Sequence, residues 1–268
     1  MKQYVRLMVL FAMLASSCRK STPAPADTRE KARLSLQFDN IVGDRNLQLN
    51  TGTYTNAVGE QFSITLCQYF ISNISVTATD GNIYTVPQDS SYFLIKESDP
   101  ATQFVHVHVP VGQYKSVSFI VGVDSLRSTM DVSKRTGVLD PSAGMDDGMY
   151  WGWNSGYIFF KLEGISNAAP LDPSGQRKFR YHIGGFGGYQ AQTLNNIKKI
   201  TVDLAAGGEP RVQAGREPNV HIMVDIMRMF NGSPNVSIAA EPTVMFSDAS
   251  IHLANNYVNM FRHDHTEN

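Results

Sequence analysis

Apolar and polar residues alternate with a period of two along most of this 268-residue chain, and few folds are compatible with such a pattern. The alternation is clearest in residues 34–39, 62–66, 117–121 and 220–226. In a β-strand it directs the apolar side chains to one face and the polar side chains to the other. Each of these segments is therefore predicted to be a strand with one buried face and one exposed face.

Other segments carry the same pattern, and Asp80-Gly81-Asn82 is typical of the tight turn that joins two strands of a hairpin. Helical periodicity is convincing only near the C-terminus, where Ser247 can cap a helix whose apolar side extends to Phe261. About ten short strands and one late helix predict an all-β fold, an antiparallel, immunoglobulin-like β-sandwich with a short C-terminal helix. The additional strands are predicted at 91–97, 103–109, 156–164, 178–184 and 197–204.

Residues 124–155 interrupt this pattern, because no period is sustained across them. Loops longer than about 15 residues are uncommon in compact domains, and most of them are functional or disordered. This segment contains Leu139, Met145, Met149 and both tryptophans, which is too much apolar mass for a disordered loop. It is therefore predicted to be a long, ordered flap that packs on the sandwich.

The N-terminal residues have the layout of a signal peptide. Lys2 and Arg6 precede a short apolar run that ends at Ala15, and small residues lead to Cys18. The run is too short to cross a bilayer as a permanent helix. A cysteine directly after small residues is typical of a bacterial lipoprotein, in which the thiol receives lipid. Without lipidation, Cys18 is only a leftover residue of the signal region.

The residues after Cys18 are rich in Pro, Ser and Ala, the composition of a spacer between a membrane and a domain. The predicted organisation is a lipoprotein signal peptide at 1–18, a flexible tether at 19–30 and a single domain at 31–268. The lipid on Cys18 would hold this domain in the bacterial cell envelope, in the periplasm or at the outer-membrane surface.

Cysteine content and charge exclude several classes of protein. Cys18 and Cys67 are the only cysteines, so no intramolecular disulfide remains once Cys18 is acylated, and Cys67 is expected to be a buried strand residue.

A net charge of -1 without a cluster of Lys and Arg argues against nucleic acid as a partner. The chain also lacks a serine-nucleophile elbow, a phosphate loop, a zinc-protease motif and a CxxC pair. It is therefore predicted not to be an enzyme.

Two pairs among the seven histidines are spaced for a shared strand face. His106 and His108 lie about 6.6 Å apart along a strand, and they can either chelate a metal together or both face solvent. His263 and His265 flank Asp264 in the C-terminal tail. Because terminal segments are often mobile, only weak metal affinity is expected there.

His182 and His221 are the stronger candidates for metal ligands. His182 ends a predicted strand at HIGGFGGYQ, where glycines allow close approach of the backbone. His221 shares a strand face with Met223, and imidazole combined with thioether is a donor set that suits copper. The predicted metal is therefore copper, and its predicted ligands are His182, His221 and Met223.

The only tryptophans, Trp151 and Trp153, lie together in MYWGWNSGYIFF, where the flap returns to a strand. Indole rings bury up to about 250 Å² each, so the pair can serve purely as packing at the base of the flap. The alternative is that one ring lines a metal or oxidation site. The sequence leaves both interpretations open.

GVLDPSAGMDDGMYWGWNSGYIFFKLEG, at 137–164, and then FRYHIGG, at 179–185, resemble the MbnP-like family of secreted copper-associated proteins, first met beside methanobactin genes. The resemblance implies a β-sandwich that binds copper through histidines, with His182 as the histidine of the H-[IL]-G motif. In the best-known members it also implies a tryptophan oxidised to kynurenine by a di-haem, peroxidase-like partner, here Trp151 or Trp153. The Asn-His pair that copper-associated members carry early in the long loop is absent, and strand-face reasoning supplies His221 instead.

Two hypotheses from different classes follow. The first is a lipid-anchored, non-enzymatic copper-binding protein that accepts oxidation from a di-haem partner. The second is a surface module that binds glycans or proteins through an aromatic platform of Trp151, Trp153, Tyr150 and Tyr157. Metal content after purification would distinguish a copper-binding protein from a glycan-binding one.

Overall fold

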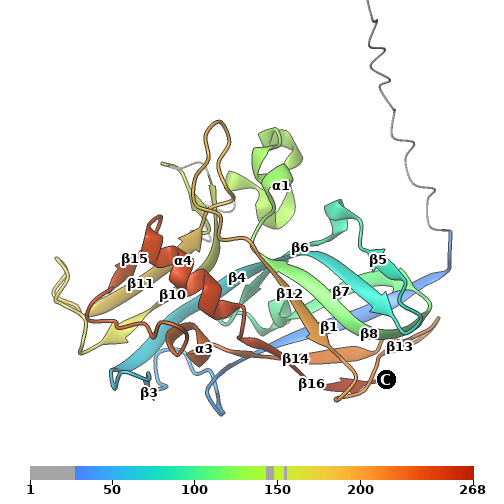
Figure 1. Ribbon diagram of the computed structural model, residues 1–268, viewed down its shortest axis with the longest axis horizontal. Coiled ribbons are helices and arrows are strands. Elements are labelled where there is room, and N and C mark those ends of the chain that lie inside the picture. Colours follow the sequence, from blue (N-terminus) through green and yellow to red (C-terminus); the bar gives the residue numbers. More distant parts are fainter. Residues whose placement is uncertain (1–27, 143–147, 154–155) are drawn as a thin grey trace, which may run out of the picture.

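The computed structural model describes residues 28–142, 148–153 and 156–268. The predicted signal peptide and Cys18 lie outside the described residues, as do most of the predicted tether and Met145 of the flap. Within the described ranges no helix is long and apolar enough to cross a membrane. The described chain forms two β-sheets that pack face to face, with the flap rising above one of them (Figure 1).

The smaller sheet has five strands and runs in the order β16-β14-β1-β2, with β7 paired to the first part of β1. Its central strand β1 is long enough to serve two partners on one edge, β7 along its first half and β2 at its end. The bounds are β1 (Lys31–Val42), β2 (Arg45–Asn46), β7 (Phe104–Pro110), β14 (Asn219–Asp225) and β16 (Phe261–Glu267).

The larger sheet has eleven strands and follows the order β12-β8-β4-β10-β11-β15, with short strands attached to its long members. Its longest strand, β4, pairs with β8 and β10 as well as with three short strands. The bounds are β3 (Tyr54–Thr55), β4 (Gln61–Ala78), β5 (Ile83–Thr85), β6 (Tyr92–Lys96), β8 (Gly112–Val121), β9 (Tyr150–Trp151), β10 (Gly156–Ser166), β11 (Lys178–Gly184), β12 (Lys198–Asp203), β13 (Arg211–Val212) and β15 (Thr243–Val244).

Helices are few and short in the described residues. Helix α4 (Asp248–Tyr257) begins after Ser247, as predicted, but it ends before Phe261, because that residue begins strand β16. The remaining helices are α1 (Ser125–Thr129) and α3 (Met227–Phe230), and the 3-10 turns are η1 (Gln88–Ser90), η2 (Pro100–Gln103), η3 (Val132–Lys134) and η4 (Gly137–Leu139). The prediction of an all-β sandwich with a short C-terminal helix is confirmed.

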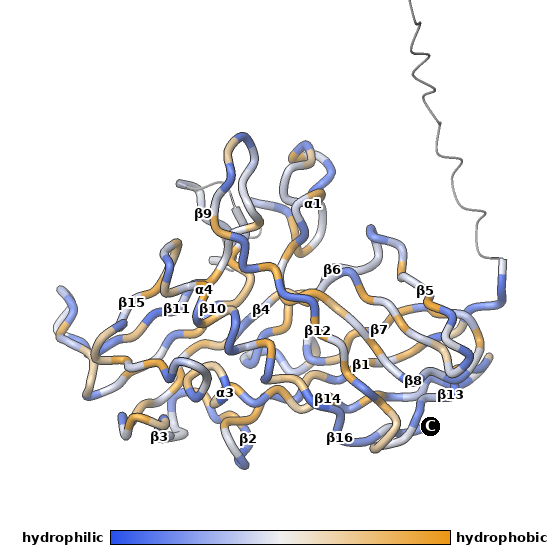
Figure 2. The backbone as a smooth tube through the Cα atoms, viewed as in Figure 1, coloured by the Kyte–Doolittle hydropathy of each residue, from blue (hydrophilic) through white to orange (hydrophobic). Residues whose placement is uncertain are grey.

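The core forms where the alternating apolar faces of the two sheets meet. Phe38 of β1 contacts Phe119 of β8 edge-to-face, with 5.3 Å between ring centres, and Phe261 of β16 contacts both rings. Edge-to-face pairs add about 0.5–1.5 kcal/mol beyond the burial of their area. Apolar segments accordingly concentrate between the layers, and hydrophilic segments follow the loops and ends (Figure 2).

Two pairings depart from the antiparallel pattern that the sequence predicts. Strand β14 runs parallel to β1, with Leu36 opposite Val220 and Phe38 opposite Ile222. Strand β15 runs parallel to β11. Alternation gives the face that each side chain occupies but not the direction of the neighbouring strand, so these pairings were not visible in the sequence. The predicted hairpin at Asp80-Gly81-Asn82 is present between β4 and β5.

The described part of the flap packs as predicted. Leu139, Met149 and Trp151 form a second apolar cluster with Phe70 of β4 and Phe159 of β10. Helix α1 and two 3-10 turns occupy the first part of the flap, and Asp124 caps α1 by accepting a hydrogen bond from the backbone N–H of Arg127. The flap therefore has an apolar base of its own on the larger sheet.

Candidate metal centre

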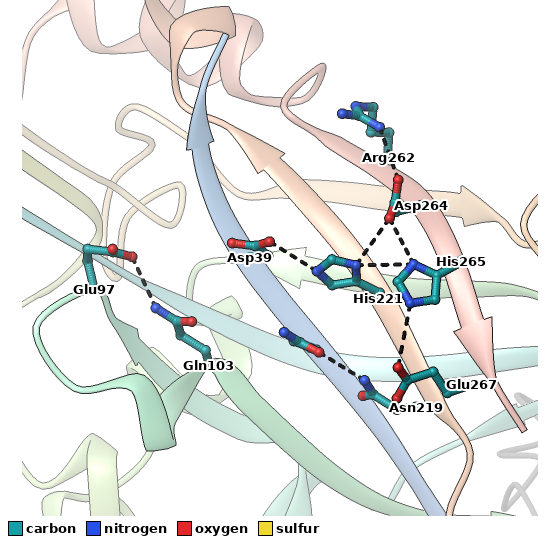
Figure 3. A network of polar contacts seen from close by, with 10 residues as sticks. Asp39, Glu97, Gln103, Asn219, His221, Arg262, Asp264, His265 and Glu267 are labelled. Atoms are coloured by element: carbon teal, nitrogen blue, oxygen red, sulfur yellow. Dashed lines mark hydrogen bonds and ion pairs between the residues drawn. The ribbon is translucent and has the colours of Figure 1, made fainter. Parts of the chain in front are cut away.

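Three potential metal ligands meet on the outer face of the smaller sheet. They are His221 of β14 and Asp264 and His265 of β16, and one ligand atom from each lies within 4.8 Å of the other two. Figure 3 shows His221 between Asp39 of β1 on one side and the two β16 residues on the other. The three candidate ligands thus come from two adjacent strands, and the neighbouring strand β1 supplies Asp39.

A β-bulge in β16 brings two consecutive residues to the same site. His221 is paired with His265 and the next residue, Ile222, is paired with His263, so Asp264 is an extra residue on β16. Without the bulge, alternation would direct Asp264 to the face opposite His265. With it, Asp264 and His265 both reach His221, whereas His263 contacts Thr266 instead.

The distances within the cluster suit a metal ion. His221 Nδ1 lies 3.4 Å from His265 Nδ1 and 3.3 Å from Asp264 Oδ2, and His265 Nδ1 lies 2.8 Å from the same oxygen. Two ligand atoms that are each about 2.05 Å from a metal are separated by about 3.3 Å at a tetrahedral angle and by about 2.9 Å at a right angle. The three atoms therefore already have the spacing of adjacent corners of a coordination polyhedron.

The far side of each imidazole faces a carboxylate. His221 Nε2 lies 3.1 Å from Asp39 Oδ2, and His265 Nε2 lies 3.7 Å from Glu267 Oε1. An imidazole that binds a metal through Nδ1 carries its proton on Nε2, and a carboxylate that accepts this proton fixes the ring orientation and increases the basicity of the ligand. Asp39 has the shorter contact and is placed to position His221 in this way.

Electrostatics link the two ligands of β16. The hydrogen bond with His265 is the largest cause that holds the pKa of Asp264 below its ordinary value. The same hydrogen bond raises the pKa of His265. In the absence of metal, Asp264 thus stabilises a proton on His265. A metal cation that displaces this proton would be attracted by the same carboxylate.

The cluster is accessible but not fully exposed. The side chain of His221 is 12% exposed, whereas those of Asp264 and His265 are 36% and 49% exposed. Packing holds His221 in place, and the two residues of β16 complete the group from the solvent side. An ion bound here would have open coordination positions toward water.

His182 does not lie near this cluster. It belongs to β11 of the larger sheet, and His221 belongs to β14 of the smaller sheet. The neighbours of each histidine along its strand are buried in the common core, so the two imidazoles point away from the core on opposite outer faces. The predicted ligand pair of His182 and His221 is therefore not formed.

The surroundings of His182 favour an ion pair over a metal site. His182 Nε2 lies 2.7 Å from Glu163 Oε1, and the ammonium of Lys161 lies 3.8 Å from the same oxygen. The hydrogen bond with His182 is the largest cause that lowers the pKa of Glu163. The ammonium of Lys161 already balances this carboxylate, so a bound metal ion would meet repulsion from Lys161.

Met223, the third predicted ligand, shares the outer face of the smaller sheet with His221. Its partners across the sheet are Asp39 and Arg262, whereas His221 faces His265. Met223 thus lies one step further along β14, about 6.6 Å from the position of His221. Among histidine, cysteine and carboxylate side chains of the described residues, the atoms that meet at His221 are the nitrogen of His265 and the oxygen of Asp264.

The two tryptophans have different environments. Trp151 is 5% exposed and packs against Phe246, whereas Trp153 is 66% exposed, and their ring centres lie 5.4 Å apart. Gly184 is required at the base of the flap, since a Cβ there would lie 2.7 Å from the Trp151 ring. The packing interpretation holds for Trp151, and only Trp153 offers its ring to solvent.

The C-terminal tail, for which the sequence predicts only weak metal affinity, supplies two of the three residues of the candidate metal centre. Its signal was present in the motif HDH, but alternation groups His263 with His265 and excludes Asp264. The bulge reverses that grouping, and a bulge leaves no period in the sequence. The sequence pattern therefore does not identify Asp39 and Asp264 as site residues. It also gives no reason to prefer His265 over the other exposed histidines.

As a class, the chain is an all-β sandwich with a candidate metal centre on the open face of its smaller sheet. It belongs to the MbnP family, whose sequence model matches residues 31–246. That match includes His221 and Asp39 but ends before α4 and β16, so Asp264 and His265 lie beyond the matched residues.

A solved structure supports the fold. The structure titled MbnP from Methylosinus trichosporium is similar to this chain with a TM-score of 0.54 and 15% sequence identity, over 82% of this chain and 82% of that one. At this identity the similarity concerns the arrangement of the strands alone. No curated protein matches the sequence.

Proposed function

We propose that this protein binds copper in the bacterial cell envelope and that His221, His265 and Asp264 hold the ion. The observation that supports this most directly is the meeting of two imidazole Nδ1 atoms and one carboxylate oxygen at ligand spacing. Imidazole nitrogen is a good copper ligand, and at sites of this kind copper binds more tightly than the other divalent first-row metals. In this role the protein binds the ion and does not catalyse a reaction.

The proposed location follows from the N-terminal sequence. Lipid on the thiol of Cys18 would attach the domain to a membrane, and the following residues would act as a tether. Mass spectrometry of the mature protein tests this. We expect a lipidated Cys18 as the first residue, and an unmodified Cys18 with cleavage elsewhere would contradict the anchor.

A di-haem, peroxidase-like partner is the proposed source of any tryptophan oxidation. Trp153 is the more accessible of the two rings and would be the target. Conversion to kynurenine begins with cleavage of the C2–C3 bond of the indole, and each of the two carbons receives one oxygen atom from water. This step releases four electrons and four protons, which reduce two molecules of peroxide to water at the haem partner. Hydrolysis of the resulting formyl group then releases formate. Peptide mass spectrometry should find the change at Trp153, and finding it at Trp151 instead would contradict this assignment.

The aromatic-platform hypothesis is less well supported. Of its four members, Trp151 and Tyr157 are buried and Tyr150 is half-buried, so they cannot form a flat exposed surface with Trp153. A platform that binds a sugar ring needs several exposed ring faces. Absence of copper together with binding to a glycan panel would restore this hypothesis.

Copper content after loading and gel filtration tests the proposed function. We expect the wild-type protein to retain copper in proportion to protein and His265→Ala to lose it. His108→Ala is the matched control, because His108 is an exposed histidine on strand β7 of the same sheet. Far-UV circular dichroism checks that each variant is folded. Equal copper retention in the wild-type protein and His265→Ala would contradict the proposed site.

A further inference from the structure

We propose that the His221–Asp264–His265 centre holds copper in its oxidised, divalent state in preference to the reduced, monovalent state. This inference rests on the proposed function, because it concerns the same site, and it adds the charge of the ion that the site selects. It follows from the type of donor atom, from the charges around the centre and from the position of Met223.

The donor atoms are of the kind that divalent copper prefers. Two nitrogens and one carboxylate oxygen converge, and nitrogen and oxygen donors in a tetragonal arrangement are typical of Cu(II). Thiolate and thioether donors select Cu(I). Cys67 cannot supply a thiolate here, because its side chain is 2% exposed within the core and burial raises its pKa.

The surrounding charge also favours the higher oxidation state. Asp264 is itself a ligand, and Asp39 and Glu267 lie behind the two imidazoles. One cation, Arg262, is close to this group, with Nη1 3.8 Å from the other oxygen of Asp264. The attraction between an ion and a carboxylate is proportional to the charge of the ion, so each carboxylate stabilises Cu(II) about twice as strongly as Cu(I).

Met223 is a soft donor on this sheet face, and its thioether could reverse the preference. Its Cα is opposite Asp39 and Arg262, one step along the strand from the pair formed by His221 and His265. The cross-strand partners of Met223 are thus an aspartate and an arginine, and not a second imidazole. The inference therefore requires that Met223 contributes little to binding of either ion.

The reduction potential of the bound copper measures this preference, because a potential below that of aqueous copper means that Cu(II) is bound more tightly than Cu(I). We expect the purified, copper-loaded protein to have such a lowered potential and a Cu(II) electron paramagnetic resonance spectrum with coupling to two imidazole nitrogens. Asp264→Asn removes charge at nearly constant size and should raise the potential. It should weaken Cu(II) at least about 10-fold, with a smaller effect on Cu(I) measured against a chromophoric Cu(I) chelator.

The variant Met223→Leu distinguishes a preference for Cu(II) from a preference for Cu(I). We expect Met223→Leu to leave the potential and both affinities unchanged. A potential above that of aqueous copper, or a loss of Cu(I) affinity in Met223→Leu, would overturn the preference for Cu(II) while leaving copper binding in place. Failure of the wild-type protein to bind either ion would overturn the inference and the proposed function together.

Discussion

The outer faces of the two sheets each carry a histidine that alternates with buried apolar residues, and the described side chains around these two histidines differ. His221 and His182 both alternate with buried apolar residues on a strand. Across the strands His221 meets a second imidazole and carboxylates, whereas His182 meets Glu163, which Lys161 also contacts. A metal centre in a sheet is therefore determined by the neighbours across the strands, which the pattern along one strand does not contain.

The largest expected effect is a loss of copper affinity, and it distinguishes the outer face of the smaller sheet from that of the larger sheet. His221→Ala should weaken copper binding by more than about 100-fold, because it removes a ligand that the other two both contact. His182→Ala should leave the copper affinity unchanged. Isothermal titration or chelator competition measures both. Equal losses in the two variants would mean that the face of the larger sheet also takes part in the site.

A smaller effect is expected from the carboxylate behind His221. Asp39→Asn should weaken copper binding by about 10–100-fold, because it removes the acceptor that orients the imidazole, and the electron paramagnetic resonance parameters should shift. Asp39→Glu should recover part of the affinity. Glu163→Gln is the matched control, since it removes the carboxylate partner of His182 on the other face. A purely structural role of Asp39 would lower thermal stability without changing the spectrum of the remaining bound copper.

The smallest expected effect is a change in stability, and it concerns Glu163 on the larger sheet. The pKa of Glu163 is lowered in the folded protein, chiefly by its hydrogen bond with His182 and also by the Lys161 ammonium. The ionised carboxylate therefore stabilises the fold above the ordinary carboxyl pKa of 4.5, and this contribution is lost as the pH falls through the lowered pKa. Glu163→Gln should reduce the free energy of unfolding by less than about 1 kcal/mol at pH 7, and the difference from wild type should shrink at acidic pH. Denaturant unfolding of both proteins at pH 7 and at a pH below the carboxyl pKa of 4.5 checks this. A difference in the free energy of unfolding that is larger at the lower pH would contradict it.

Much of the fold could be predicted from the sequence, because a period of two is a direct consequence of strand geometry. Strand β11 occupies the segment predicted for it, and the turn at Gly81 and the start of α4 follow from local residue preferences. The parallel pairing of β1 with β14 could not be predicted, since it depends on contacts between residues far apart in the chain.

The candidate site was only half predictable. His221 was identified because its strand pattern assigns it to an outer face. Its neighbours, Asp264 and His265, are not predictable, because nothing local indicates that the tail pairs with β14 or that a bulge turns Asp264 toward His221. The motif and the glycine turn predict His182 as a ligand, but Gly184 serves the packing of Trp151.

Crystallographic localisation of copper by anomalous diffraction tests the central claim most directly, because it needs no variant and distinguishes the two faces in one experiment. The account predicts an anomalous peak between β14 and β16, within about 2.0–2.2 Å of His221 Nδ1, His265 Nδ1 and a carboxylate oxygen of Asp264. A peak beside His182 on the outer face of the larger sheet, with none at His221, would contradict it.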